Sequence, residues 1–440
     1  MKQQSMTART GQRLQVPVLE GADITPAADD WPDRVDDTAY HGLPGEIVRA
    51  IEPHSEADPV ALLIQFLVAF GNVIGHGAHF VADGAVHYMN LFAVLVGETS
   101  KARKGTSWSQ VIRLFDSCAA QWKTERAMTG LSSGEGLIWQ VRDPIQKPER
   151  DRKTKKVEEV VVDVGVSDKR ALVYEPEFAS VLRMLQRDGN TLSPIIRTAW
   201  ESGTLRALTK NSPARATGAH ISIVGHIVAD ELKRYLQLSE IAGGFGNRFL
   251  WICVRRSKAL PDGGRLDRVD FAPILRRLGA AIEFSRKPRR LERDESARAI
   301  WHKVYPDLSE GKPGLAGALI ARAEAQVMRL ASVYALLDRS TLIRPAHLTA
   351  ALALWEFAER SVYHIFGRAL GDPIADDIYE ALKSRPSGLS RTDIRDLFQR
   401  NVSRDRIGRA LALLYRFKLA EPKSVATDGR PAEVWVLVAG

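Results

Sequence analysis

The loop at residues 96–107, VGETSKARKGTS, has the residue types that bind phosphate. It follows the apolar run NLFAVL, and a buried strand that opens into a loop with glycine, lysine and threonine is typical of a phosphate-binding loop. Backbone N–H groups at the next helix would hold the phosphates together with a lysine, and a hydroxyl would hold Mg²⁺. The residues expected to bind ATP here are Gly97, Lys104, Gly105, Thr106 and Ser107, with Thr106 as a ligand of Mg²⁺.

This loop departs from the standard spacing, Gly-x4-Gly-Lys-Ser/Thr. It is one residue longer, and Arg103 stands before Lys104 where the second glycine is expected. Gly105 also separates the lysine from Thr106, as some nucleotide kinases tolerate. The loop alone therefore leaves two interpretations open, a nucleotide site with an unusual loop or a basic loop that binds no nucleotide.

Two glutamates end the next predicted strand, in the segment ALVYEPEF. In P-loop ATPases an acidic pair at this place holds the magnesium shell and polarises the attacking water. We expect Glu175 to be the metal-side carboxylate and Glu177 to be the general base. The alternative is that both carboxylates only interact with the dipole of the following helix.

A histidine and an arginine follow further along the chain. His226 ends the predicted strand HISIVGHI, where a polar side chain can sense the γ-phosphate, although such a histidine can equally be hydrogen-bonded scaffold. Arg248 follows the turn GGFGN and could reach the nucleotide of a neighbouring subunit as an arginine finger. Its alternative role is that of a structural cation.

In chain order, VGETSKARKGTS, VYEPEF, ISIVGH, GNRFL and ARAEAQVMRLA resemble a family of P-loop proteins from phages and mobile elements. More distantly, they resemble the AAA+ core of minichromosome-maintenance helicases. In that group a Ser-Arg-Phe turn carries the arginine finger that acts in trans, which the resemblance places at Arg248. A lid helix carries the sensor-two arginine, which the resemblance places at Arg322, with Arg329 as the second choice. Here the arginine-to-glutamate spacing in that helix is two residues rather than three.

The elements that must position these side chains alternate between strands and helices, which predicts an α/β core with a largely parallel sheet. We expect a P-loop, AAA+-like ATPase core preceded by a helical region and followed by a helical lid, with a winged helix at the C-terminus. The predicted divisions are a flexible arm (1–37), an N-terminal helical region (38–88), the ATPase core (89–264), the lid region (265–370) and the winged-helix domain (371–440).

Composition agrees with an ordinary globular protein. The 440 residues are 45% hydrophobic and 26% charged. The two cysteines, Cys118 and Cys253, lack metal-type spacing and suit a reducing cytoplasm. We see neither a membrane span nor a secretory segment and expect a cytoplasmic protein. The net charge of +9 fits a nucleic-acid partner, although a basic surface alone would give the same charge.

Two predicted hairpins are candidates for contact with DNA. In hexameric helicases of this type a hairpin before the sensor strand points a basic residue into the central channel. The segment LRALTKNSPARATGAH has that form, with Lys210 and Arg215 beside its tip, where they would follow a single strand without reading its sequence. An ordinary solvated hairpin is the alternative. The charged segment 147–170 is a second, weaker candidate.

The predicted winged helix offers a further DNA-binding surface. In NVSRDRIGRALALLYRF the apolar residues share one helix face. Arg404, Arg406 and Arg409 lie elsewhere on that helix and could contact a groove or the phosphate backbone. Winged helices also dock proteins, so contact with DNA is one of two possibilities.

Together these features predict a hexameric replicative DNA helicase of a phage or mobile element, which hydrolyses ATP between subunits and moves along a single strand of DNA. Two alternatives remain: an ATP-dependent helicase loader or DNA-binding regulator without unwinding, and a winged-helix DNA-binding protein whose P-loop has decayed.

Overall fold

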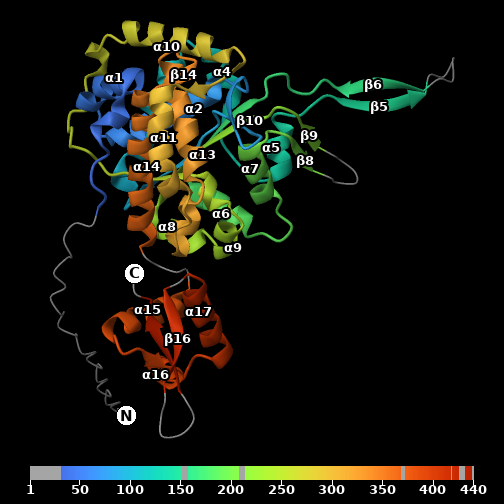
Figure 1. Ribbon diagram of the computed structural model, residues 1–440. Helices are drawn as coiled ribbons and strands as arrows, with labels where there is room; N and C mark the ends of the chain where they lie inside the picture. The colour runs from blue at the N-terminus through green and yellow to red at the C-terminus, as the bar shows by residue number, and fades with distance from the viewer. Residues whose placement is uncertain are drawn as a thin grey trace, which may run out of the picture. The chain divides into compact units, whose positions relative to one another are not determined.

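The computed structural model describes residues 31–150, 157–207, 214–367, 372–417, 419–425 and 432–438 (Figure 1). Most of the predicted flexible arm (1–37) and the predicted DNA contact Lys210 lie outside these residues. The three parts expected before the C-terminal domain are described first, over residues 38–367, and the C-terminal part follows separately.

The centre of the fold is a five-stranded sheet in which every neighbouring pair of strands is parallel. Its strands are β3 (Phe92–Gly97), β4 (Ala127–Met128), β7 (Arg170–Glu175), β10 (His220–Val228) and β11 (Leu250–Cys253), in the spatial order β11-β3-β10-β7-β4. The middle strands are runs of valine, leucine and isoleucine and are almost fully buried, as expected for a parallel sheet covered on both faces. The predicted α/β class is therefore confirmed.

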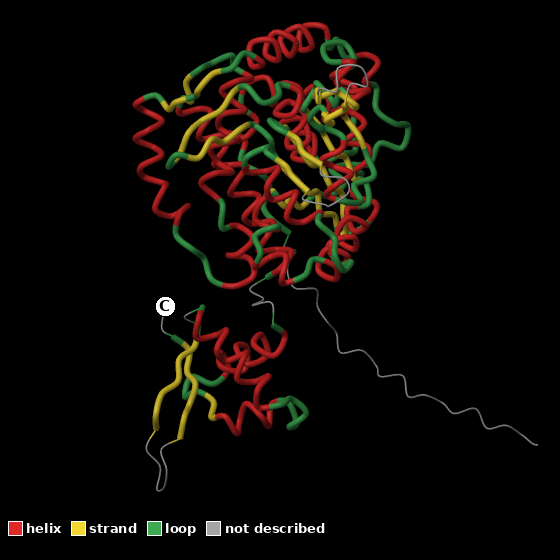
Figure 2. The backbone as a smooth tube through the Cα atoms, turned by 90° about the vertical axis from the view of Figure 1, so that its right-hand side faces the viewer, coloured by secondary structure: helices red, strands yellow, loops and turns green. Residues whose placement is uncertain are grey.

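Helices cover this sheet on opposite faces (Figure 2). Neighbouring residues of a strand point to opposite faces. On β10, His226 contacts α2 (Pro59–Val73), whereas Gly225 lies against Phe178 of α6 (Phe178–Leu185). Helices α2 and α6 are therefore on opposite sides of the sheet. Although α2 was expected in a region before the core, its nearly continuous apolar surface packs it directly on β3, β7 and β10.

The remaining helices complete the layers. α3 (Lys104–Ile112) follows β3 and packs on α2, α13 (Ala323–Leu337) packs on α14 and α2, and α14 (Pro345–Phe366) packs on β11. The others are α1 (Gly42–Ile51), α4 (Ala120–Arg126), α5 (Gly134–Trp139), α7 (Leu192–Glu201), α8 (Ala229–Tyr235), α9 (Leu238–Ala242), α10 (Ala272–Arg286), α11 (Glu295–Ser309) and α12 (Gly314–Ile320). The helices of the predicted lid region thus pack directly against the central sheet and the helices that cover it.

Short strands form four further small sheets in this part of the chain. They are β12-β1-β2 (Arg289–Arg290, Ala78–Ala82, Ala85–Tyr88), β13-β14 (Glu292–Arg293, Leu342–Ile343), β5-β6 (Ile145–Arg150, Val157–Asp163) and β8-β9 (Leu205–Ala207, Ala214–Ala216). The β5-β6 hairpin extends away from the helices (Figure 1).

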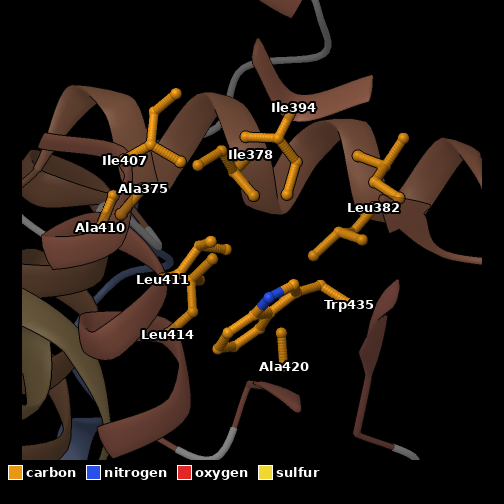
Figure 3. Close-up of a cluster of buried hydrophobic side chains, with 11 residues drawn as sticks. Ala375, Ile378, Leu382, Ile394, Ile407, Ala410, Leu411, Leu414, Ala420 and Trp435 are labelled. Carbon is orange, nitrogen blue, oxygen red and sulfur yellow. The ribbon is translucent and has the colours of Figure 1, made fainter. Parts of the chain in front are cut away.

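The C-terminal part has its own hydrophobic core. Its elements are α15 (Pro373–Ser384), β15 (Leu389–Ser390), α16 (Arg391–Leu397), α17 (Arg404–Arg416), β16 (Ala420–Val425) and β17 (Ala432–Leu437). The strands form an antiparallel sheet in the order β15-β17-β16. Trp435 packs among isoleucine and leucine side chains of all three helices (Figure 3). The sequence predicted three helices and two strands, and the structure adds β15 as a third strand.

Candidate functional site

The lysine loop joins β3 to α3. Gly97 ends the strand, and α3 begins at Lys104. The ammonium of Lys104 lies back across the loop and donates to the carbonyl of Thr99 at 3.3 Å. A Cβ on Gly97 would lie 2.7 Å from that nitrogen and 2.7 Å from Cβ of Ala102, so a larger residue would crowd the loop. Burial lowers the pKa of Lys104, with the charge of Glu231 acting in the opposite direction.

Arg103 explains how the loop closes without its second glycine. Its φ is 56°, in the left-handed region that favours glycine. For another residue this conformation costs about 1–2 kcal/mol. The side chain of Arg103 forms an ion pair with Glu56, with 2.6 Å between Nε and Oε2. The loop therefore keeps the backbone turn of a glycine while presenting an arginine.

A buried chain of hydrogen bonds connects α3 with the sheet through Gln65 of α2. His226 Nε2 lies 2.9 Å from Gln65 Oε1, and Gln65 Nε2 donates to Ser107 Oγ at 2.7 Å. Ser107 Oγ donates in turn to the carbonyl of Lys104 at 2.6 Å. All three linking side chains are buried. The chain fixes the first turn of α3, which carries the lysine.

This arrangement separates the two hydroxyls expected to bind the nucleotide and its magnesium. Ser107 is fully buried and uses its hydroxyl within the chain, so its position does not fit a metal ligand. Thr106 is partly exposed, and its hydroxyl forms no side-chain hydrogen bond with the part of the chain that the structure describes. Thr106 thus remains the hydroxyl suited to hold Mg²⁺.

His226 is placed inside the protein. Burial, followed by the charge of Lys104, lowers its pKa to about 3, so the ring is neutral at pH 7. Because Gln65 Oε1 can only accept a hydrogen bond, the single N–H of the neutral ring is at Nε2. Nδ1 faces the hydroxyl of Tyr174 at 3.5 Å. The neutral ring has no second N–H for a phosphate, so this position fits a role in holding Gln65 better than the expected role of direct sensor.

The two glutamates differ in exposure. Glu175 is buried, and its Oε1 accepts from the backbone N–H groups of Gly130 and Leu131 at 2.7 and 2.6 Å. This carboxylate fixes the loop after β4. Glu177 is exposed at the start of α6 and caps no backbone group. Since β10 lies between β3 and β7, both glutamates are at the same carboxyl edge of the sheet as Lys104.

Arg248 and Arg322 are at the opposite edge. Arg248 precedes β11, whose strand direction is that of β3, and therefore lies at the amino edge of the sheet. The guanidinium groups of both arginines pair with Glu201. The side chain of Arg248 is 6% exposed and that of Arg322 is 33% exposed. Neither can reach Lys104 of its own chain in this arrangement, and Arg322 is the more accessible.

Arg329 is part of the core. It is fully buried, stacks on the indole of Trp200 at 3.7 Å, and donates to the carbonyls of Asn90 and Trp200, both at 2.7 Å. Burial lowers its pKa to about 9. A side chain held in this way ties α13 to the amino edge of the sheet, so the second choice for sensor two does not fit a nucleotide contact.

The two hairpins are joined at their bases by Asp143, which precedes β5. Its carboxylate accepts from the Thr217 hydroxyl at 2.7 Å and from Lys169 at 2.9 Å, and its N–H donates to the carbonyl of Arg215 at 2.8 Å. The exposed Arg215 side chain lies 3.6 Å from the same carboxylate. The bases of β5-β6 and β8-β9 therefore form one hydrogen-bonded unit, which we call the hairpin pair.

The three arginines of α17 differ in exposure and in whether they form an ion pair. Arg406 pairs with Asp372 through two hydrogen bonds of 2.5 and 2.9 Å, and this pairing raises its pKa. It therefore joins α17 to the start of α15. Arg404 and Arg409 are exposed and form no ion pair within the described residues. Of the predicted DNA contacts on this helix, these two remain available.

Sequence reasoning missed Gln65, Asn72 and Asp143. Gln65 and Asn72 are seven residues apart on the otherwise apolar α2 and therefore share a face. Asn72 donates to the carbonyl of His220 and to the hydroxyl of Ser222 on β10, and Gln65 contacts His226 further along the same strand. Polar residues that recur on one face of each of two otherwise apolar segments, α2 and β10, could have predicted that these segments pack together through hydrogen bonds.

No family model matches this chain, and a search of curated proteins returned no match. Among the described helices, none has the length and apolar character required to cross a membrane.

Proposed function

We propose that this protein is an ATP-hydrolysing DNA motor with an AAA+-like core, a hexameric replicative helicase of a phage or mobile element. One observation carries the proposal. Lys104 follows the first strand of the five-stranded sheet, Glu175 ends the third strand, and His226 lies two residues before the end of the fourth, so all three are towards one edge. The spatial strand order is fifth-first-fourth-third-second, which places the strand before the lysine loop beside the strand that carries His226.

The residues at this edge suit a nucleotide. Gly97 leaves space beside the Lys104 ammonium, and Arg103 closes the loop in the conformation of a glycine, which favours a working loop over a decayed one. Magnesium would neutralise phosphate charge and would be held by Thr106. The exposed Glu177 would accept the proton of the attacking water. Glu175 and the Gln65 chain would hold the surrounding loops.

The arginines at the amino edge would complete the site of a neighbouring subunit. Arg322 would stabilise the transferring phosphate from there, because it is more exposed than Arg248. Arg248 would position Arg322 through their shared partner Glu201. Hydrolysis would then depend on assembly of the chain with copies of itself.

DNA would be bound by the hairpin pair and by the C-terminal part. The coupled hairpins would move along single-stranded DNA as one unit, and Arg215 and the predicted contact Lys210 would bind the DNA phosphates. Three helices with a three-stranded antiparallel sheet fit a winged helix, with Arg404 and Arg409 available for the DNA backbone.

The first experiment is an ATPase assay with and without single-stranded DNA. We expect wild-type turnover that DNA stimulates, and a loss of at least about 100-fold in Lys104→Ala. Lys101→Ala is the matched control, since Lys101 is an exposed lysine of the same loop. Absence of turnover in the wild type would reject the motor and leave the DNA-binding alternative.

The second experiment separates a helicase from a loader. Displacement of a strand from a forked duplex, with ATP and wild-type protein, is expected for the helicase only. The particle mass with an ATP analogue and DNA tests the assembly, and a persistent monomer would remove Arg322 and Arg248 from the mechanism.

A third experiment tests the action between subunits. Lys104→Ala and Arg322→Ala should each be inactive alone. Mixed in one assembly, they should regain part of the activity, because some interfaces then combine an intact lysine with an intact arginine. No gain on mixing would place Arg322 outside the site.

A further inference from the structure

A cavity of about 800 Å³ lies near the amino edge of the sheet, away from the lysine loop. Its walls are the β1-β2 hairpin, the strands β12 and β13, helix α11 and the first turns of α13. Pockets for small ligands have volumes of about 300–1,000 Å³. The cavity thus has the size of a ligand site. None of the residues at the lysine loop line it, but Arg322, which is proposed to act on a neighbouring subunit's nucleotide, is part of its wall.

The cavity contains arginines without carboxylate partners. Four arginines and three carboxylates line it, and Arg290 pairs with Glu292. Arg293 has instead the sulfur of Met328 at 3.2 Å and the face of Trp301 at 5.0 Å. Neither Arg293 nor Arg298 forms an ion pair within the described residues. Burial, followed by the like charge of Arg298, lowers the pKa of Arg293. Two neighbouring guanidinium groups without carboxylate partners, one partly buried and one exposed, favour an anion.

Aromatic side chains lie beside these arginines on α11. Trp301 is 7% exposed and packs at 5.6 Å against Tyr305, which is 45% exposed and offers a free ring surface. Aromatic faces next to arginines bind nucleotide bases by stacking. The remaining carboxylates, Asp83 and Glu324, disfavour a long polyphosphate, so a single phosphate fits better.

We infer that this cavity binds one nucleotide unit, with its phosphate on Arg293 and Arg298 and its base against Tyr305. The unit could be a free nucleoside monophosphate or part of a single strand, since both present the same base and phosphate. The site is distinct from the lysine loop and does not depend on hydrolysis there.

The test uses the full chain with Lys104→Ala, so that the lysine loop contributes little. Binding of AMP by calorimetry and of a fluorescein-labelled (dT)12 by anisotropy distinguishes the two sources. Arg298 and Tyr305 are both exposed on α11, so the variants Arg298→Ala and Tyr305→Ala should fold. Each substitution should lower the affinity for the probe that the parent protein binds by about tenfold. Arg276→Ala, an exposed arginine of α10 outside the cavity, should leave binding unchanged.

Cross-linking locates the ligand. Photolysis with 8-azido-AMP, or with iododeoxyuridine in the oligonucleotide, should label the segment 290–305. Failure of both probes to bind would overturn the inference. So would binding that persists unchanged when Arg298 and Tyr305 are replaced together, or labelling confined to other segments.

Discussion

The two edges of the central sheet carry opposite kinds of chemistry. At the carboxyl edge, Gln65, Ser107 and neutral His226 form a closed chain of hydrogen bonds around one lysine. At the amino edge, the guanidinium groups of Arg248, Arg322 and Arg329 surround one indole, and two of them share one carboxylate.

The two edges differ in whether their buried polar groups have hydrogen-bond partners. Within the described residues, the buried Nε atoms of Arg248 and Arg329 have no hydrogen-bond acceptor. A surplus of donors and positive charge is costly unless an anion neutralises it. The carboxyl edge is thus satisfied within the chain, whereas the amino edge keeps buried arginine donors without an acceptor among the described residues. The predictions below separate the structural from the functional members of each edge.

The largest effect is expected from the core of the amino edge. Arg329→Met would leave the buried carbonyls of Asn90 and Trp200 without their donor. We expect the free energy of unfolding to fall by about 3–5 kcal/mol, as when a buried polar network is broken. Urea denaturation measures it, with Arg276→Met as the exposed control. An unchanged midpoint would mean that Arg329 is free for a ligand.

Breaking the chain at the carboxyl edge should have a smaller effect on stability. Gln65→Leu removes the partner of both Ser107 and His226 at nearly constant volume, which should cost about 1–3 kcal/mol. If the chain positions Lys104, the affinity for ATP should fall as well. A variant that loses stability but binds ATP normally would limit the chain to a structural role.

The pH dependence of stability should report the buried histidines. Burial lowers the pKa of His226 and His220 to about 3 from an ordinary 6.5. The unfolded chain therefore binds protons below pH 6.5 that the folded chain excludes. Stability is complete above that pH and falls as pH decreases, by at most about 1.4 kcal/mol per pH unit for each histidine.

Thermal unfolding between pH 7.5 and 5.5 measures this slope. His220→Gln and His226→Gln should each flatten it. A slope that neither variant changes would assign the effect to other groups.

The smallest effect is expected at Arg103. Arg103→Gly removes the strained φ and also a partly exposed ion pair with Glu56, two contributions that oppose each other. The free energy of unfolding should change by less than about 1 kcal/mol, and ATP binding should persist. Arg103→Val is the contrasting variant, because a branched side chain disfavours this φ more strongly. Equal stability of both variants would contradict the left-handed conformation.

The sequence determined the local features of this protein. Runs of valine, isoleucine and leucine predicted buried parallel strands, and the segment at 96–107 predicted a strand, loop and helix around Lys104. These features depend on neighbours in the chain, whose periodicity is visible in one sequence.

Only the tertiary structure decided which polar groups meet. Gln65 joins Ser107 and His226 across separations of 42 and 161 residues, and Arg329 meets Asn90 across 239. The same packing buried Ser107 and Arg248 while leaving Thr106 and Arg322 accessible. A residue type states which chemistry is possible, but burial and partners decide whether its atoms are free, and these depend on segments far apart in the sequence.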